Sequence, residues 1–399
     1  SISTNYMHFA FKRGETFNGR FNIPTGGTVG AYGTGDMPYF TNDGNSCLTG
    51  TDVTIQNIHA YATNTTGSFT TIEIYGASLL QDCLVYGDDN KAVLVSAANG
   101  TVVNRNVLIN GVAQVIALFE SQNCIVSNNV IIAEDGAGVT SGVFIHGTGS
   151  SGHQIIQNRI IKEASVEAAA FQRAIYIASD IGTPATPMLI RANRIEGRWE
   201  LDMEFAGPKS NVLLNVIDAN KYINGINVYI NNTTNIRFVS NSIYTIDAGG
   251  TPIGIVAFDD ASNYLRNNVW DMQGSDATGT QVAANGSYQN IGNNVDADYT
   301  IGHDSRRSLS NNQNWNLQTL AGWQAASGKD TNSIDFQVGT YPATQDLWAD
   351  EDNGDFAPSA DSPLISSGLY IDEVDGINFN ERLAPGSFWP SVDGSRNYI

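Results

Sequence analysis

The residues best able to do chemistry gather in the middle of this 399-residue chain. Glu134, Glu163 and Arg198 each stand five residues after the Asn of a short repeated phrase. If those phrases stack, the three side chains align on successive layers of the structure. Neighbouring segments supply further groups, so the predicted catalytic residues are Glu134, Glu163, His146, Tyr176, Arg198, Asp202 and Glu204.

Two chemistries fit these side chains. A pair of carboxylates can hydrolyse a glycosidic bond, one protonating the leaving oxygen while the other activates water or attacks. His, Tyr, Lys or Arg can instead abstract and return protons in a β-elimination from a uronic acid. The alternative is structural, because outward positions on a stacked repeat are often charged simply to face water.

Substrate binding is expected from the cations and aromatic rings of the same region. A ring can stack on a sugar, and a cation can pair with an acidic substituent, although most strand aromatics serve packing. The predicted substrate-binding residues are Lys162, Arg173, Trp199 and Tyr229.

A repeated phrase predicts the elements that position these residues. An apolar strand, an Asn or Asn-Asn and a second apolar strand recur about every 26 residues, as in IVSNNVIIAE and IRFVSNSIYTI. The anchor positions are Asn57, Cys83, Asn106, Asn129, Asn158, Asn193, Asn215, Asn241, Asn268 and Asn294. Short alternating strands at this period indicate one coil of a parallel β-helix per repeat.

The Asn of each phrase is expected at a sharp bend between two strands. Asn tolerates left-handed backbone geometry, and its side-chain amide can bond to the next Asn in a buried ladder. The phrases together predict an all-β fold, a right-handed parallel β-helix of about ten coils.

The opening and closing segments carry a family resemblance. The segments FKRGETF and YGTGDMP near the start, and NGDFAPSADSPLISSG at 353–368, resemble those that flank the coils of the right-handed parallel β-helix superfamily. This superfamily includes pectate-lyase-like enzymes and phage tailspikes, so the resemblance implies a carbohydrate-active protein. The pectate-lyase motif vWiDH and the polygalacturonase motifs NTD, GHG and RIK are absent, which argues against pectin chemistry in its common forms.

The spacing also predicts the organisation of the chain. Residues 1–50 are expected to form an N-terminal cap and first coil, 51–300 the coils, and 301–399 a C-terminal capping extension. The intervals 129–158 and 158–193 are the longest, so loops project there, and loops on a rigid scaffold often carry function. The chain starts at Ser1, which is compatible with removal of a leader or an upstream domain.

Composition narrows the partners. A net charge of −20 argues against nucleic acid, which needs a basic surface, and no apolar run is long enough to span a membrane. The charge also disfavours a polyanionic substrate unless basic residues gather locally. No cofactor is certain, although Asp350, Asp352 and Asp355 suggest a calcium loop. Cys47, Cys83 and Cys124 lack metal-ligand spacing and are expected to be small core residues.

The predicted function is therefore polysaccharide binding, with degradation by a lyase or glycoside hydrolase as the expected activity. The alternative is a non-enzymatic structural or adhesive β-helix, such as a fibre, spike or surface-layer component. Either protein would act outside the cell, secreted or on a virion surface, and either could form a homotrimer. The step from fold to function follows from the resemblance, since one fold serves many functions.

Overall fold

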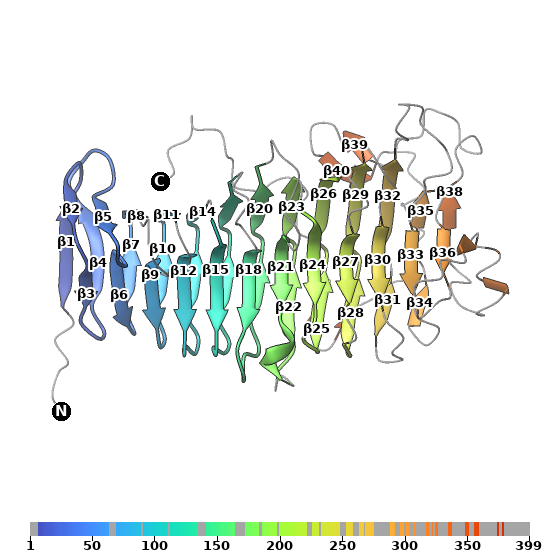
Figure 1. Cartoon of the computed structure of the whole chain (residues 1–399), viewed down its shortest axis with the longest axis horizontal. Helices are drawn as coiled ribbons and strands as arrows, with labels where there is room; N and C mark the ends of the chain where they lie inside the picture. Colours follow the sequence, from blue (N-terminus) through green and yellow to red (C-terminus); the bar gives the residue numbers. More distant parts are fainter. Residues whose placement is uncertain are drawn as a thin grey trace. The chain divides into compact units, whose positions relative to one another are not determined.

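The computed structural model describes residues 7–308 with internal gaps, together with short strand and helix segments as far as Asn378. The gaps lie at 64–68, 89–90, 111, 135–140, 164–171, 183–185, 198, 222–225, 231–232, 248–252, 258–262, 267, 275–287, 292–295, 299–300 and 304–305. The chain divides into two compact units, one of residues 1–188 and 390–399 and the other of residues 189–389. Figure 1 shows the strands in sequence colours.

The first unit is built from three parallel sheets, and each coil contributes one strand to every sheet. Sheet A of this unit consists of β1 (His8–Lys12), β4 (Thr28–Tyr32), β7 (Thr54–Gln56), β10 (Leu79–Gln81), β13 (Val102–Asn104), β16 (Ile125–Ser127) and β19 (Gln154–Ile156). Sheet B consists of β2 (Thr16–Asn18), β5 (Tyr39–Asp43), β8 (His59–Thr63), β11 (Leu84–Gly87), β14 (Val107–Asn110), β17 (Val130–Ala133) and β20 (Arg159–Lys162). Sheet C consists of β3 (Phe21–Ile23), β6 (Leu48–Thr51), β9 (Thr70–Tyr75), β12 (Lys91–Ser96), β15 (Gln114–Phe119), β18 (Ser141–His146) and β21 (Arg173–Ile177).

The second unit repeats this arrangement. Its sheet A holds β22 (Met188–Arg191), β25 (Ser210–Leu213), β28 (Ile236–Val239), β31 (Tyr264–Arg266) and β34 (Asp296–Asp298). Its sheet B holds β23 (Arg194–Gly197), β26 (Val216–Lys221), β29 (Ser242–Asp247), β32 (Val269–Gly274), β35 (Ile301–His303) and β38 (Ile334–Phe336). Its sheet C holds β24 (Leu201–Phe205), β27 (Ile226–Ile230), β30 (Ile253–Ala257), β33 (Tyr288–Ile291), β36 (Arg306–Ser308) and the antiparallel β37 (Leu317–Gln318).

The remaining described elements are small. They are the 3₁₀ turn η1 (Ser179–Ile181), the pair β39 (Trp348–Asp350) and β40 (Asp355–Pro358), and the pair β41 (Glu373–Val374) and β42 (Ile377–Asn378). No helix in the described part of the chain has the length and apolarity of a membrane-spanning segment.

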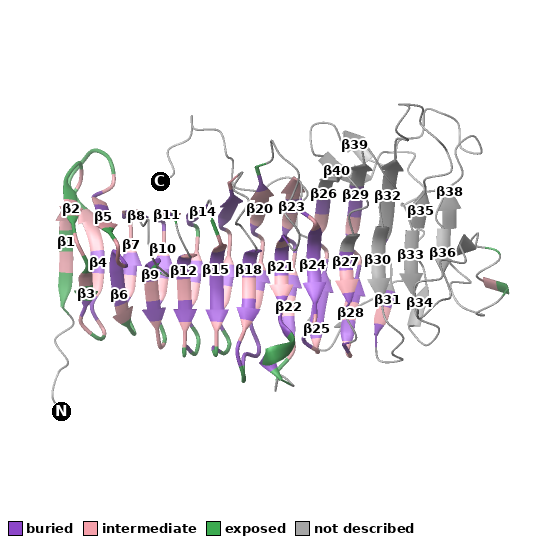
Figure 2. Ribbon diagram, in the orientation of Figure 1, coloured by how far each residue is buried: buried purple, intermediate pink, exposed green. Residues whose placement is uncertain are grey.

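The predicted fold class, an all-β right-handed parallel β-helix, is confirmed, and the predicted number of coils differs only slightly. Three short strands per coil form because each strand alternates apolar and polar residues and ends at a bend. Inward side chains such as Ile55, Leu80 and Val103 stack in register and are at most 1% exposed. Figure 2 shows this buried interior in the first unit. Stacking buries an apolar face that one coil alone could not bury.

The bend between sheets A and B contains the predicted Asn ladder. In the first unit, Oδ1 of Asn129 accepts from Nδ2 of Asn106 at 3.0 Å, and Oδ1 of Asn158 accepts from Nδ2 of Asn129 at 2.9 Å. The same bonds link Asn193, Asn215, Asn241 and Asn268 in the second unit. These amides are 1% exposed or less, so the ladder satisfies polar groups that are otherwise buried.

Two details of the predicted ladder are wrong. The left-handed residue is the one before the ladder Asn, as at Arg105 (φ 54°) and Asn128 (φ 56°). Asn57 also occupies this preceding position. Gln56 pairs with Gln81, so Asn57 is equivalent to the left-handed Asp82 of the next coil. The ladder position in the coil of Asn57 is therefore the buried Ile58. Asn294 lies outside the described residues.

The predicted division into cap, coils and C-terminal extension stays a prediction. Strands β1 to β6, within residues 8–51, already pair in the three sheets. Strand β38, beyond residue 300, pairs with β35 in parallel. These pairings show that stacked strands extend past both predicted boundaries.

The outer face of sheet B carries a second apolar cluster. Val107, Val130 and Ile132 point away from the interior, yet they are 8%, 1% and 6% exposed. Leu84, Ile109 and Ile161 pack against them. Sheet B thus differs from the outer face of sheet C, where most of the partly exposed side chains are aromatic or polar and Leu94 is aliphatic.

Candidate functional site

The outer face of sheet C in the first unit brings together three of the predicted site residues, His146, Tyr176 and Arg173. The register places Phe119 beside His146, and Phe144 beside Tyr176. Since adjacent strands lie about 4.8 Å apart, side chains in one register column are close enough to stack. All five side chains are partly exposed.

The rings of this group, which we call the sheet C ladder (Phe119, Phe144, His146 and Tyr176), are in contact, and three of them stack nearly parallel. The centroids of Phe144 and Tyr176 are 5.1 Å apart at an interplanar angle of 9°, and those of Phe144 and His146 are 4.2 Å apart at 7°. The Phe119 and His146 rings are 4.7 Å apart and tilted by 41°. The guanidinium of Arg173 lies over the Tyr176 ring, 4.4 Å from its centroid. Such a cation–π contact orients the arginine and stabilises the platform.

Burial lowers the pKa of His146 below its usual value; the charge of Asp180 opposes this shift and that of Lys91 adds to it. The imidazole is therefore neutral at pH 7 and can accept a proton. Its Nε2 makes no hydrogen bond to a protein group within the described residues. Asp180 is held in place because its Oδ1 accepts from the backbone N–H of Gly147 at 3.0 Å.

The charge on sheet C differs from that of the whole chain. Strands β9, β12, β15, β18 and β21 contain only three residues of charged type, Glu73, Lys91 and Arg173. Two of the three are basic, whereas acidic residues outnumber basic ones 40 to 20 in the chain. Burial lowers the pKa of Lys91, and the nearby Glu73 carboxylate opposes that shift. On these strands alone basic residues outnumber acidic ones by one, while the segments that follow β15 and β21 add the exposed Glu120 and Asp180.

The predicted carboxylates Glu134 and Glu163 do align, but at the end of sheet B. Ala133 pairs with Lys162, which puts the two glutamates at equivalent positions on adjacent coils. Glu163 is exposed, whereas Glu134 is partly buried and accepts a short hydrogen bond from the hydroxyl of Tyr86. Arg198, the third member of the predicted column, lies outside the described residues.

Lys162 has a structural contact rather than an exposed head group. Its side chain is 5% exposed, and Nζ donates to the backbone carbonyl of Glu134 at 2.9 Å. The contact ties two successive coils at the bend between sheets B and C. A role of Lys162 in binding substrate stays a prediction.

The remaining predicted residues belong to the second unit. Asp202 and Glu204 occupy the outward positions of β24, yet they are 0% and 4% exposed. Glu204 pairs in register with Tyr229, and burial together with the Glu204 charge raises the pKa of the Tyr229 hydroxyl. Trp199 is 1% exposed and donates from Nε1 to the carbonyl of Glu196 at 3.1 Å, so its ring presents no open face to a sugar.

The cysteines and the calcium candidate have no evident part in a site. Cys47, Cys83 and Cys124 are free and buried, each at a different bend of the coil, as expected for core residues. Burial raises the pKa of the Cys47 and Cys83 thiols to about 12, which makes them poor nucleophiles. No group of three or more metal-ligating side chains exists in the described residues. Asp350 pairs in register with Asp355 across β39 and β40, and Asp352 lies outside the described residues. A calcium site there stays a prediction.

Sequence reasoning missed Phe119 and Phe144. The interval from Asn129 to Phe144 is 15 residues, whereas that from Asn158 to the neighbouring Tyr176 is 18. Counting from the ladder therefore does not align them, because the intervening loops differ in length. The similar strand patterns GVFIHG and RAIYIA, with an aromatic residue between two apolar ones, are the signal that could have found Phe144.

Comparison with known proteins agrees with the fold alone. No family model and no curated protein matches the sequence. Solved structures with a similar backbone include a Dettilon tailspike protein (12% identity, TM-score 0.39), the catalytic domain of a GH87 α-1,3-glucanase (10%, 0.44) and PfbA, a surface adhesin of Streptococcus pneumoniae (11%, 0.39). The chain has the parallel β-helix fold.

The matches extend over much of this chain but less of the larger proteins. They cover 75%, 83% and 77% of this chain, in the same order. The chain spans only 59% of the tailspike and 64% of the glucanase domain, and 82% of the adhesin.

Proposed function

We propose that this protein binds a polysaccharide along the outer face of sheet C in the first unit, and that it degrades the bound chain. The observation that carries the proposal is the sheet C ladder, a row of four partly exposed rings whose neighbouring centroids are 4.2 to 5.1 Å apart. Such a row forms a continuous apolar surface against which the C–H groups of a sugar chain can pack.

The substrate class follows from the charge of that face. Lys91 and Arg173 provide positive charge on a surface with a single acidic strand residue, Glu73. A polysaccharide with acidic sugars is therefore favoured over a neutral one. Lys91 and Arg173 are the local basic contacts that the proposal offers to an acidic substrate in a chain with a net charge of −20.

The chemistry proposed for this site is proton transfer. His146 is neutral and lies within the ladder, but its Nε2 is buried, so its ring would have to turn outward to take a proton from a sugar carbon; the Tyr176 hydroxyl is a candidate to return one to the leaving oxygen. This assignment makes elimination the favoured reaction. Hydrolysis by Glu134 and Glu163 is the second possibility, favoured by their register on adjacent coils. A degrading protein of this kind would act outside the cell or on a virion surface.

A panel of acidic and neutral polysaccharides tests the proposal. Retardation in native gels containing each polymer measures binding, ultraviolet absorbance detects the unsaturated ends left by elimination, and a reducing-sugar assay detects hydrolysis. The proposal expects retardation and new unsaturated ends with an acidic polymer. Retardation without either product would favour the non-enzymatic adhesive alternative, and the absence of retardation across the panel would contradict the proposal entirely.

A further inference from the structure

A second aromatic group lies on the outer face of sheet B in the first unit, at its edge towards sheet C. Tyr61 and Tyr86 pair in register on β8 and β11, and their ring centroids are 4.8 Å apart at an angle of 80°. The perpendicular rings form a corner, unlike the flat platform of the sheet C ladder. We call Tyr61, Tyr86, Asp88 and Glu134 the sheet B corner.

Two carboxylates complete this corner. The Tyr61 hydroxyl donates to Oδ2 of Asp88 at 3.4 Å, and the Tyr86 hydroxyl donates to Oε2 of Glu134. Glu134 reaches Tyr86 from two coils further along the helix, since Tyr86 pairs with Ile109 and Ile109 with Ile132. Each hydroxyl donates towards a carboxylate, so the carboxylates keep further lone pairs for another donor.

Electrostatics distinguishes the corner from the sheet C ladder. Burial raises the pKa of the Tyr61 and Tyr86 hydroxyls, and the negative charges of Asp88 and Glu134 raise both pKa values further. The nearby ammonium of Lys162 is bound to the backbone carbonyl of Glu134, so one positive charge lies beside two negative ones. The potential in the corner therefore favours a cation.

We propose that the sheet B corner binds the ammonium group of an amino sugar. Perpendicular tyrosine rings present electron-rich faces to a compact cation, and the two carboxylates accept its N–H groups. The choice of an amino sugar as the source of the ammonium rests on the polysaccharide-binding function proposed above. The corner borders the sheet C face, because Asp88 precedes Lys91 by only three residues. One polymer with amino and acidic sugars could thus contact both faces.

Isothermal titration calorimetry with a short, fully deacetylated chitosan oligosaccharide tests this inference. The fully N-acetylated oligosaccharide of equal length is the matched ligand, because acetylation removes the charge and keeps the ring. We expect binding of the amine form only. Glu134→Gln should weaken it by about tenfold, the effect of losing about 1.4 kcal/mol of charge attraction.

Two protein variants complete the experiment. Tyr86→Phe removes only a hydroxyl and should weaken binding less than Glu134→Gln does. Glu120→Gln removes one negative charge from an exposed bend between sheets C and A, and it should leave the affinity unchanged. Equal affinity for both oligosaccharides, or equal effects of Glu134→Gln and Glu120→Gln, would overturn the inference. Failure of the sheet C site would show instead in the polysaccharide panel, without altering this titration.

Discussion

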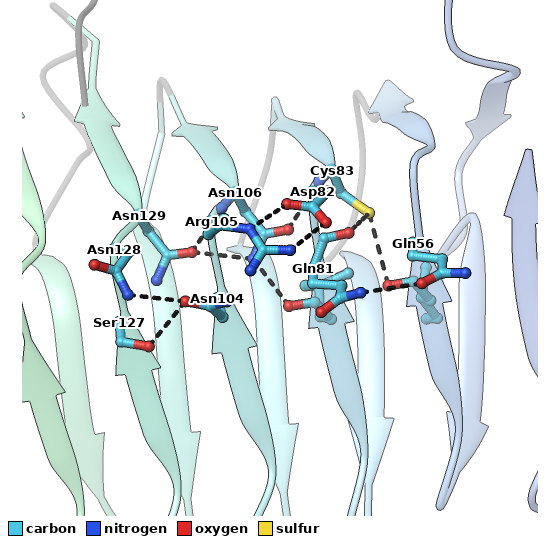
Figure 3. A network of polar contacts seen from close by, with 12 residues as sticks. Gln56, Gln81, Asp82, Cys83, Asn104, Arg105, Asn106, Ser127, Asn128 and Asn129 are labelled. Atoms are coloured by element: carbon cyan, nitrogen blue, oxygen red, sulfur yellow. Dashed lines mark hydrogen bonds and ion pairs between the residues drawn. The ribbon is translucent and has the colours of Figure 1, made fainter. Parts of the chain in front are cut away.

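At the residue scale, the side-chain amides of the Asn ladder form hydrogen bonds with buried polar groups of the interior. Asn129 makes four hydrogen bonds: Oδ1 accepts from the backbone N–H and Nδ2 of Asn106, while Nδ2 donates to Oδ1 of Asn158 and to the carbonyl of Val103. Figure 3 shows Asn106 and Asn129 beside the more exposed network that joins Gln56 to Gln81 and Arg105 to Asp82. Loss of a buried amide should therefore lower the free energy of unfolding more than loss of an exposed pair.

Replacement of Asn129 should be strongly destabilising. Asn129→Ala leaves the buried N–H of Asn106 and the Val103 carbonyl without partners, which should lower the free energy of unfolding by about 3 kcal/mol. The urea midpoint measures the change. Ser127→Ala, on the same bend but partly exposed, is the control and should cost under about 1 kcal/mol. Similar losses in the two variants would show that the ladder bonds add little.

A second ladder makes the stability depend on pH. At the bend between sheets C and A, the backbone N–H groups of Val53, Ser78 and Cys124 donate to Ser78, Thr101 and His153 respectively. His153 is 0% exposed, and burial lowers its pKa to about 4. Because the folded protein holds this imidazole neutral, its contribution is complete above the unfolded pKa of about 6.5 and is lost as the pH falls towards 4.

The expected loss between pH 6.5 and pH 4 is about 3 kcal/mol from this residue alone. Urea unfolding across that range measures it. His153→Asn keeps an acceptor for the Cys124 N–H without a titrating group, as Asn263 does for Ile236 in the second unit. The variant should lose markedly less stability than the wild type over this range. Parallel pH profiles would exclude His153 as the cause.

At the scale of the elements, the bends demand left-handed residues where glycine is often missing. Ala97 follows β12 with φ of 45°, and its N–H donates to the carbonyl of Phe119 at 3.1 Å. A side chain with a β-carbon is strained in this region by about 1 kcal/mol. The hydrogen bond to the next coil holds the bend in this conformation.

Relief of that strain should be measurable. Ala97→Gly is expected to raise the free energy of unfolding by about 0.5 kcal/mol, since glycine adopts positive φ without a steric cost. Ala98→Gly, one residue later and 3% exposed, should instead lower it, by about 1 kcal/mol. Thermal unfolding compares the pair, and a fall in stability for both variants would contradict the strain argument.

At the scale of the whole molecule, the repeat was predictable because burial of Asn leaves a regular trace in the sequence. The same regularity placed Glu134 opposite Glu163. It also predicted that Glu134 and His146 lie on different strands across a bend, and they lie at the end of sheet B and on sheet C. The ring contacts of Phe144 were hidden because loop lengths vary from coil to coil. The hydrogen bond between Tyr86 and Glu134 joins residues 48 positions apart. It depends on how far the two side chains extend, which the spacing of residues in the sequence does not reveal.

The central claim is that the sheet C ladder binds polysaccharide. Its most direct test compares the affinity of wild type, Phe144→Ala and Tyr32→Ala for the polymer that retards the protein most in native gels. Tyr32 is an aromatic residue on sheet A that is 53% exposed, so it controls for loss of any surface ring. The account predicts that Phe144→Ala weakens binding about tenfold, because it removes the central ring of the stack, while Tyr32→Ala binds like wild type. Undiminished binding by Phe144→Ala would contradict it.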